Sequence, residues 1–565
     1  MAPLKIFYQI QGGNAIREPR KDLHFQVRNL IMKLILHKEE AALKKDTSYT
    51  IRRAEHFKAT LTAEGFLVGA VAGLVVLAYR VLLEYAGAGT ELVLEYGKKY
   101  PAAAIAWFLV LAGLACIVGR LVKYEPMISG SGIPQVEGEM MGKLEQVWWK
   151  VIPAKFLGGF LSLFAGLSLG REGPSIQIGA MTGKAVSKLL DRGKTEERYL
   201  LTCGASAGLA AAFHAPLAGV MFSLEEIHKN FSVSVLISVM TASITADYIS
   251  SQFLGFSSVF RFDIGLEVQP GYYWHILILG VILGFLGAFY NKMTLWVQNL
   301  YYKVKGLNET TRLFLPFLLA GILGLVMPQV LGSGHELIEN AAGGGLALTT
   351  LLVLLGVKFI FSLLCFGSGA PGGIFFPLLV LGALIGGVYS TFAVEFMGLP
   401  ASYISNFVLL AMAGYFTAIV RAPITGIILI FEMTGQVSQM LSMSLVSIAA
   451  YLVATALKSE PIYESLLNGL LKRRGQEVPG KTGEKLLQEF VVSYNSVLQG
   501  KMIQQIQWPR NCLLVAVKRN EAELIPKGRT ILMAGDTLVT MSDEADAPAV
   551  YDYMEKACAE RRDIK

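Results

Sequence analysis

The sequence predicts an all-α polytopic membrane domain, followed by a small cytoplasmic α/β domain. Hydrophobic residues make up 53% of the 565 residues and charged residues only 16%, whereas soluble proteins carry about 25% charged residues. The charges gather in residues 1–60, in the segment 186–198 and after residue 456, and apolar runs between them reach the roughly 20 residues that cross a bilayer. The 58 glycines favour close helix packing and broken helices, as in a transporter or channel.

The apolar runs define the membrane domain and its two halves. We expect the spans to include Phe66–Leu83, Ile105–Val122, Trp274–Phe289, Leu313–Leu331 and Leu346–Cys365. Lysines and arginines precede the first run and follow the last, which places both termini in the cytoplasm. The expected parts are a cytoplasmic extension with a lead-in helix at 1–59, a membrane domain at 60–470 with halves at about 60–255 and 270–457, a linker at 471–483, and the small domain at 484–565.

Several classes of function are excluded by the same sequence. The five cysteines form no C-x-x-C pair, and three lie in apolar runs, so we expect buried thiols and no metal site. The net charge of +7 needs no nucleic-acid partner, because basic residues cluster at the ends of the spans. The chain has no catalytic order of Ser, His and Asp and no phosphate-binding loop, so we expect neither an enzyme nor a bound cofactor.

An internal repeat organises the membrane domain. Ala215–Gly219 reads APLAG and Ala422–Gly426 reads APITG, and a glutamate follows six residues past each glycine, at Glu225 and Glu432. A Gly/Pro-rich break lies upstream of each segment. Paired interruptions at corresponding positions of two halves indicate a transporter with a binding site between its repeats. The pattern leaves open whether the halves are inverted.

Three breaks in the apolar sequence are suited to holding an anion: Ser129–Pro134, Gly170–Pro174 and Gly367–Pro377. A helix start has about four backbone N–H groups without partners and roughly half a positive charge. A start that faces a cavity therefore binds an anion without a buried cation, and weakly enough to release it during transport. In the first break, Ser131 adds a hydroxyl between Gly130 and Gly132.

Glu172 lies in the second break, between Arg171 and Gly173, at an expected helix start inside the membrane. A carboxylate at this depth is costly unless it has partners, and positive helix ends would supply them. The carboxylate would then occupy the anion's own place, where an ion displaces it or a proton neutralises it. We interpret Glu172 as a gate that couples anion and proton movement, with a helix-capping carboxylate as the alternative.

Other ionisable residues of the apolar region have simpler interpretations. Glu225 and Glu226 are expected at a solvated helix end. His214 is expected to be a hydrogen-bonded polar residue at a helix start, with a proton carrier as the alternative. Glu137 and Lys155 are isolated among apolar residues, and we expect them to form a buried pair.

Together these segments resemble the CLC family of chloride channels and chloride/proton antiporters, over about residues 60–470. GSGIP at Gly130–Pro134, GREGP at Gly170–Pro174 and GGIFFP at Gly372–Pro377 are similar to the three anion-site signatures of that family. The resemblance implies a homodimer with one pore in each subunit and two inverted halves.

The resemblance also implies an anion site made of side chains and backbone. Ser131 and the hydroxyl of Tyr463 would hold the central anion, and serine at this position goes with chloride rather than nitrate. Backbone amides at Ile374 and Phe375 would face the ion.

Proton transfer is the second activity that the resemblance implies. Glu172 falls on the gating glutamate and Glu226 on the inner proton-transfer glutamate, a position that is typically not acidic in the channels of the family. Glu137 and Lys155 match buried charges of the family. An acidic residue at position 226 therefore favours an antiporter.

After Gly475 the chain departs from relatives that carry paired CBS domains. We expect strands at Phe490–Ser493, Cys512–Lys518 and Thr537–Met541, and a short helix at Leu498–Gln505. The tail resembles the TrkA-C (RCK-C) regulatory module of potassium-transport proteins. That resemblance implies a dimerising domain open to a small ligand.

The sequence therefore predicts a proton-coupled chloride antiporter, with a voltage- or ligand-gated chloride channel of the same family as the alternative. It is expected to be a multi-pass protein of a plasma membrane such as the bacterial inner membrane, and its partners are chloride, protons and membrane lipid. A potassium or sodium system, suggested by the tail alone, is disfavoured because the sequence has no Thr-Val-Gly-Tyr-Gly-like filter.

Overall fold

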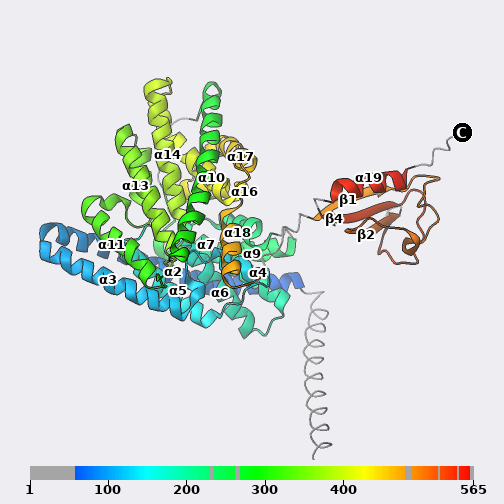
Figure 1. Ribbon diagram of the computed structural model, residues 1–565, viewed down its shortest axis with the longest axis horizontal. Helices are drawn as coiled ribbons and strands as arrows, with labels where there is room; N and C mark the ends of the chain where they lie inside the picture. Colours follow the sequence, from blue (N-terminus) through cyan, green and yellow to red (C-terminus); the bar gives the residue numbers. More distant parts are fainter. Residues whose placement is uncertain are drawn as a thin grey trace, which may run out of the picture. The chain divides into compact units, whose positions relative to one another are not determined.

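The computed structural model describes residues 57–229, 233–256, 258–260, 262, 267–304, 306–476, 485–519, 522–543 and 546–559. It divides into two compact units, Met1–Leu467 and Asn468–Lys565, which we describe separately (Figure 1). Most of the predicted cytoplasmic extension and most of the predicted linker lie outside the described residues.

The first unit is a bundle of helices of very unequal length. Its first half contains α2 (Phe57–Lys99), α3 (Pro101–Tyr124), α4 (Ile133–Met140), α5 (Trp148–Phe164), α6 (Glu172–Leu189), α7 (Lys194–Phe213), α8 (Pro216–Phe222), a π-helical turn (Ser223–His228) and α9 (Val233–Leu254). Its second half contains α10 (Tyr273–Lys303), α11 (Thr311–Val326), α12 (His335–Ala342), α13 (Leu348–Gly367), α14 (Phe375–Phe396), α15 (Ile404–Val420), α16 (Pro423–Thr434) and α17 (Met440–Ala456). The helix α18 (Ile462–Arg473) follows.

Two features mark this unit as a membrane domain: long apolar helices, and apolar side chains on their outer faces. Seven helices in the described part of the chain are long and apolar enough to cross a bilayer. Large apolar side chains are exposed on their outer faces, for example Leu109 at 71% and Leu452 at 60%. Such extensive apolar exposure is suited to lipid rather than water. The predicted span Leu313–Leu331 ends early, at Val326, because Pro328 starts a separate 3-10 turn.

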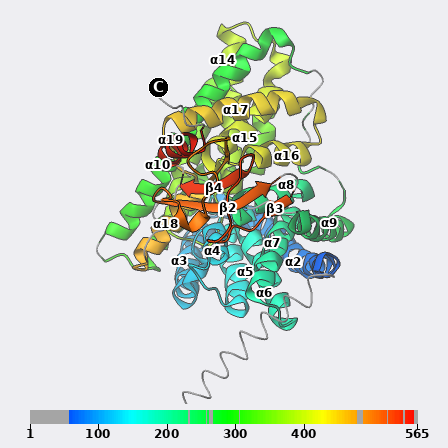
Figure 2. The same cartoon turned by 90° about the vertical axis from the view of Figure 1, so that its right-hand side faces the viewer.

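The two halves repeat one another element by element. Short 3-10 turns at Pro126–Ile128 and Pro328–Val330 each lead to two glycines of positive φ and then to an eight-residue helix, α4 or α12. Figure 2 shows α2 and α5–α7 gathered on one side and α14–α17 on the other. The predicted duplication is therefore present in the fold, from α2–α9 to α10–α17.

Two equivalent hydrogen bonds join the halves, one donated by each half, as expected if a two-fold axis relates the halves to each other. Gly130 donates from its backbone N–H to the carbonyl of Gly369 at 3.3 Å, and Gly332 donates to the carbonyl of Gly166 at 3.1 Å. Gly130 and Gly332 hold equivalent positions in the two halves, as do Gly166 and Gly369 after α5 and α13. The core of the first half lies among α2, α6, α7 and α9, where it includes Val76, Leu200 and Val239.

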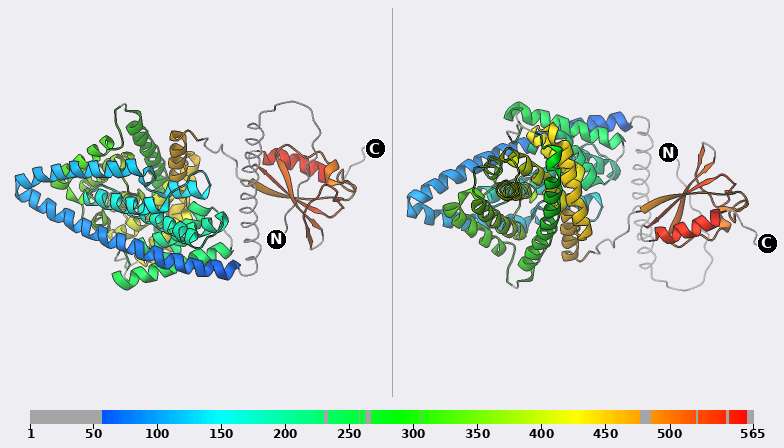
Figure 3. Two further views of the ribbon diagram at one scale, coloured as in Figure 1. Left: turned by 90° about the horizontal axis from the view of Figure 1, so that it is seen from below. Right: turned by 90° about the horizontal axis from the view of Figure 1, so that it is seen from above.

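The second unit contains a four-stranded antiparallel sheet with the order β1-β4-β2-β3. Figure 3 shows the sheet with the C-terminal helix packed beside it. Its elements are β1 (Lys485–Val491), β2 (Cys512–Arg519), β3 (Ala522–Leu524), β4 (Thr537–Asp543) and the helix α19 (Ala547–Cys558). Phe490, Val517 and Leu538 share one face of the sheet and pack with Val550 and Met554 of α19.

The elements of this unit agree only in part with those that the sequence predicted. The strands predicted at 512–518 and 537–541 are confirmed as β2 and β4, and the one predicted at 490–493 begins earlier as β1. The helix predicted at Leu498–Gln505 is wrong, since only a 3-10 turn forms, at Ile503–Gln505. Neither β3 nor α19 was predicted.

Candidate functional site

The three Gly/Pro-rich breaks meet in the middle of the first unit. Gly170 and Gly373 exchange two backbone hydrogen bonds, of 2.7 and 2.8 Å, as an isolated antiparallel bridge. Gly372 donates to the carbonyl of Gly130 at 3.0 Å. Segments that are about 240 residues apart in sequence, as between 130 and 372, are thus hydrogen-bonded to each other. The starts of α4, α6 and α14 come together at this point.

Glycine is required where α6 approaches the turn before α4. A Cβ on Gly173 would lie 2.7 Å from the carbonyl oxygen of Ser131 and 3.2 Å from Cα of Gly373, and it would overlap Ser131 Oγ. Gly130 and Gly132 have positive φ angles of 67° and 96°, a conformation that glycine adopts at no steric cost. These glycines let the three helix starts approach one another closely.

Two buried hydroxyl groups at this place have no hydrogen-bond partner in the part of the chain that the structure describes. Ser131 is 2% exposed and Tyr463, at the start of α18, is 0% exposed, and neither side-chain oxygen makes a hydrogen bond within the described residues. A buried hydroxyl without a partner is costly. Each can donate its O–H to an anion.

A series of aromatic contacts links the ring of Tyr463 to Phe222, Phe375 and Phe416. Phe222 at the end of α8 lies with ring centroids 6.2 Å from Tyr463 and 5.9 Å from Phe375, both edge-to-face. Phe416 of α15 packs 4.8 Å from Phe375. Ile374, beside Phe375, is 1% exposed. The sequence analysis missed Phe222 and Phe416, which lie in apolar helices and carry no motif of their own.

Glu172 is the first residue of α6 and its carboxyl group is completely buried. Neither oxygen meets hydrogen-bond geometry with any described residue. The carboxyl faces backbone amides of α6 and of Phe376 in α14, and Oε2 occupies the space that a Cβ on Gly170 would fill. Its electrostatic field reaches the buried hydroxyls of Tyr463 and Tyr79. Tyr79, which the sequence did not indicate, likewise has a hydroxyl without a hydrogen-bond partner among the described residues.

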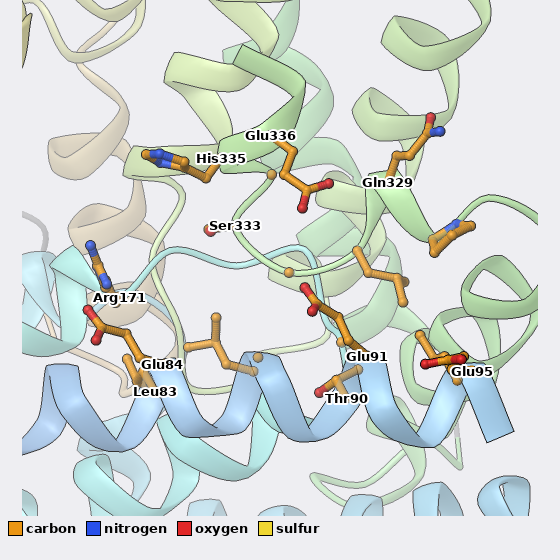
Figure 4. Close-up of a pocket in the computed structure, with 18 of the residues that line it drawn as sticks. Leu83, Glu84, Thr90, Glu91, Glu95, Arg171, Gln329, Ser333, His335 and Glu336 are labelled. Atoms are coloured by element: carbon orange, nitrogen blue, oxygen red, sulfur yellow. The ribbon is translucent and has the colours of Figure 1, made fainter. Parts of the chain in front are cut away.

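A cavity of about 660 Å³ adjoins the segment that carries Glu172. Arg171 lines it together with α2 and the turn at 332–336 (Figure 4). Figure 4 shows Glu84 on the same side as Arg171, with Glu91 and Glu336 farther along the cavity. The lining is mixed in charge and polar enough to hold water.

A second buried carboxyl group lies on the π-helical turn after α8. Glu226 is 6% exposed, and its Oε1 has no hydrogen-bond partner within the described residues. π-Helical turns are rare and occur frequently at functional sites. The charges of Glu137, Lys229 and Glu464 act on Glu226, and the field of Glu226 reaches Tyr463.

The prediction of a solvated helix end is wrong for Glu226, which is buried, and also for Glu225, which is hydrogen-bonded within the protein. The Oε2 of Glu225 accepts hydrogen bonds from the backbone N–H of Thr425 at 2.9 Å and from the hydroxyl of Thr425 at 2.7 Å. In the other half, Glu432 accepts from the backbone N–H groups of Leu217 at 2.9 Å and Ala218 at 2.7 Å. Each of the two repeated glutamates therefore caps the helix start of the opposite half, α16 or α8.

The predicted pair of Glu137 and Lys155 is also wrong. Lys155 donates to the carbonyls of Ile128 at 2.8 Å and Gly130 at 2.6 Å, whereas Glu137 pairs with Lys229 at 2.6 Å. The buried ammonium therefore holds the turn before Ser131 in place.

Lys358 repeats this arrangement in the second half of the domain. It donates to Val330 at 2.9 Å and Gly332 at 3.0 Å. His214, after α7, is hydrogen-bonded to Asp247 at 3.2 Å and to Ser251 at 3.1 Å, as a polar residue between two helices should be.

Known proteins resemble both parts of the chain. The model of the voltage gated chloride channel family matches residues 113–455, and that of the TrkA-C domain matches residues 487–555. The H(+)/Cl(-) exchange transporter ClcA of Vibrio campbellii (strain ATCC BAA-1116) is 37% identical over 427 residues, 73% of this chain and 91% of that protein. That of Klebsiella pneumoniae (strain 342) is 33% identical over 430 residues, 74% of this chain and 90% of that protein.

Among solved structures, a slow cyanobacterial Cl-/H+ antiporter superposes with a TM-score of 0.70 at 30% identity, over 74% of this chain and 99% of that one. These matches confirm the resemblances that were seen in the sequence for the membrane domain and for the tail.

Proposed function

The chain belongs to the CLC family of voltage gated chloride channels, and from this premise we propose that it exchanges chloride for protons across the membrane. The chloride/proton exchange named for the relatives from Vibrio and Klebsiella, and for the cyanobacterial structure, supports this reading over a passive channel.

One observation of the molecule carries the proposal. Two carboxyl groups, Glu172 and Glu226, are buried, and each has at least one oxygen without a hydrogen-bond partner in the described chain. A buried carboxyl group without partners is expensive, and a passive anion pore does not need two. Their free-energy cost is explained if both groups take up and release the transported proton.

Chloride would lie between the hydroxyl of Ser131 and that of Tyr463, with the amides of Ile374 and Phe375 facing it. These donors carry no full charge, so the ion binds and also leaves. The helix-start dipoles of α4, α6 and α14 stabilise the negative charge.

Glu172 would alternate between two states at the outer side of this site. As a carboxylate it lies against the amides at the starts of α6 and α14 and blocks the anion position there. When a proton neutralises it, the attraction to those amides falls, and chloride can take its place. The cavity lined by Arg171 would give water and chloride access to Glu172, and Glu226 would exchange the proton with the other side.

The test is a flux measurement on protein reconstituted in liposomes. An outward chloride gradient should drive protons against their own gradient in the wild type. Glu172→Ala should abolish proton movement and keep chloride flux, and Glu226→Gln should abolish coupling. If the wild type moves chloride with no proton movement, the chain is a channel and the proposal fails.

The cellular setting follows from the same premise. We place the chain in a plasma membrane with both termini in the cytoplasm, as a homodimer with one chloride path in each subunit. The tail would regulate transport through a small ligand or through its own association. Light scattering in detergent should give a protein mass of twice 61.5 kDa, whereas a mass of one chain would contradict the dimer.

A further inference from the structure

A cluster of charged side chains lies between Glu226 and the surface of the first unit. Lys229 ends the π-helical turn with a left-handed backbone, at φ 53°. Its Nζ lies 2.6 Å from Glu137 Oε1 and 4.0 Å from Glu464 Oε2. Each of these groups acts electrostatically on Glu226. The cluster draws on α4, the π-helical turn and α18.

The side chains of this cluster range from buried to nearly half exposed. Glu226 and Glu137 are buried, at 6% and 1% exposed. The side chains of Lys229 and Glu464 are 38% and 46% exposed. Glu464 can therefore exchange a proton with water, and the two buried carboxyl groups cannot do so directly.

The other three carboxylates of this region are each stabilised by a hydrogen-bond donor, a cation or water. Glu225 accepts from the N–H and hydroxyl of Thr425. Glu137 is paired with Lys229, and Glu464 is in water. Glu226 makes no ion pair with a described residue, and its Oε1 has no hydrogen-bond partner there. Glu137 Oε2 also has no partner in the described chain, but Glu137 has the counter-charge of Lys229. The cluster thus contains more acidic groups than cations, and Glu226 is the place where an extra proton relieves the most repulsion.

We propose that Glu464 and Lys229 form the cytoplasmic mouth of the proton path, with Glu464 exchanging protons with water and Lys229 holding the charge of Glu137, so that the transported proton resides on Glu226. This inference rests on the proposed proton coupling and adds two residues to it. Neither was singled out by the sequence, because their relation to Glu226 exists only in the fold.

The transfer involves only O–H bonds. An O–H bond of a hydronium ion breaks as an O–H bond forms on the carboxylate of Glu464, and a water molecule remains. The O–H bond on Glu464 then breaks as a new O–H bond forms on Glu226, through intervening water, and Glu464 becomes ionised again. Lys229 keeps its proton throughout. The reverse sequence returns a proton to the cytoplasm.

The experiment compares full-length variants in liposomes, with proton and chloride fluxes recorded from the same vesicles. Glu464→Gln removes the titratable group and keeps the shape of the side chain. Its proton flux should fall roughly tenfold at neutral pH, less than the 10²–10⁴-fold that positioned acid–base groups contribute, because water still reaches Lys229. Chloride flux should persist, so the number of chloride ions moved per proton rises. The defect should shrink as the pH falls and protons become abundant.

Lys229 has its own pair of variants. Lys229→Met leaves Glu137 without a counter-charge, so Glu137 competes with Glu226 for the proton, and the chloride-to-proton ratio should rise. Lys229→Arg keeps the charge and should restore the ratio. Glu145→Gln is the matched control, because Glu145 is an exposed carboxylate in the loop between α4 and α5 and should leave both fluxes unchanged.

The outcomes separate this inference from the proposed function. If the wild type shows no coupling, the proposed function itself fails. If the wild type couples but Glu464→Gln keeps the wild-type ratio, Glu464 is not on the path. If proton and chloride fluxes fall in proportion in Glu464→Gln and Lys229→Met, the two residues only support the structure, and the inference is overturned.

Discussion

A methyl group on Gly173 would enter the contact between α6 and the turn that carries Ser131. The alanine Cβ would lie 2.7 Å from the carbonyl oxygen of Ser131 and 3.2 Å from Cα of Gly373, and it would overlap Ser131 Oγ. Non-bonded carbon atoms are at their optimal separation at about 3.5–4.0 Å. Most of the crowding atoms belong to backbone, so one helix start must move away from the other.

The cost can be converted into a change in chloride affinity. An extra methyl group in a tightly packed site costs about 1–3 kcal/mol. If that strain falls on the arrangement that binds the ion, the Kd for chloride rises about 5- to 140-fold, since every 1.4 kcal/mol is a factor of ten. The affinity for chloride should fall rather than rise, because the substitution moves Ser131 away from the starts of α6 and α14.

Calorimetric titration of purified Gly173→Ala with chloride measures this change directly. Gly113→Ala is the matched control, because a Cβ on Gly113 in α3 would meet no other atom within 4 Å. Gel filtration shows whether each variant remains folded. A folded Gly173→Ala protein with the chloride affinity of Gly113→Ala would refute the assignment of the site to these helix starts.

Further predictions concern the residues that hold the site and the tail. Lys155→Met leaves two buried carbonyls without their donor, at about 1–3 kcal/mol each, so the protein should unfold at a lower temperature in detergent and chloride flux should fall. Glu432→Ala removes the cap of α8, and by the usual value of about 0.5–2 kcal/mol it should also lower the unfolding temperature, as followed by tryptophan fluorescence. In the tail, burial tends to raise the pKa of Asp536, but hydrogen bonds from Arg519 and from a backbone amide outweigh it and hold that pKa below its ordinary value. Ionised Asp536 therefore stabilises the tail at every pH above the ordinary Asp pKa of about 3.9. This stabilisation is lost as the pH falls through the lower pKa of the folded state. Asp536→Asn should therefore speed hydrogen exchange of β2 and β4 at pH 7, and much less near pH 3.

The sequence predicted those parts of the site that depend on backbone breaks. Glycine and proline determine where helices start, so the breaks around Gly130, Gly170 and Gly372 were readable as helix starts before the fold was known. The repeat was readable for the same reason, because both halves keep the APxxG segment and its following glutamate. Glu172 was identified because a carboxylate in an apolar run is unusual.

Partners that lie far apart in the chain were not predictable. Glu225 caps a helix 200 residues away, and nothing near it in sequence announces that contact. Glu137 pairs with Lys229 rather than with Lys155, because the fold brings the end of the π-helical turn against α4, and nothing near either residue in the sequence indicates that contact. The helix α19 was missed because it has only 12 residues, and its apolar face, which includes Val550 and Met554, is correspondingly short.

The most direct test of the account is to locate the anion by anomalous diffraction from crystals grown in bromide. The account predicts a bromide peak between the hydroxyls of Ser131 and Tyr463 in the wild type. In Glu172→Gln it predicts a second peak, at the position of the wild-type carboxylate beside the starts of α6 and α14. Bromide found only elsewhere in the membrane domain, or no second peak in the variant, would contradict an anion site that is built from helix starts and shared with Glu172.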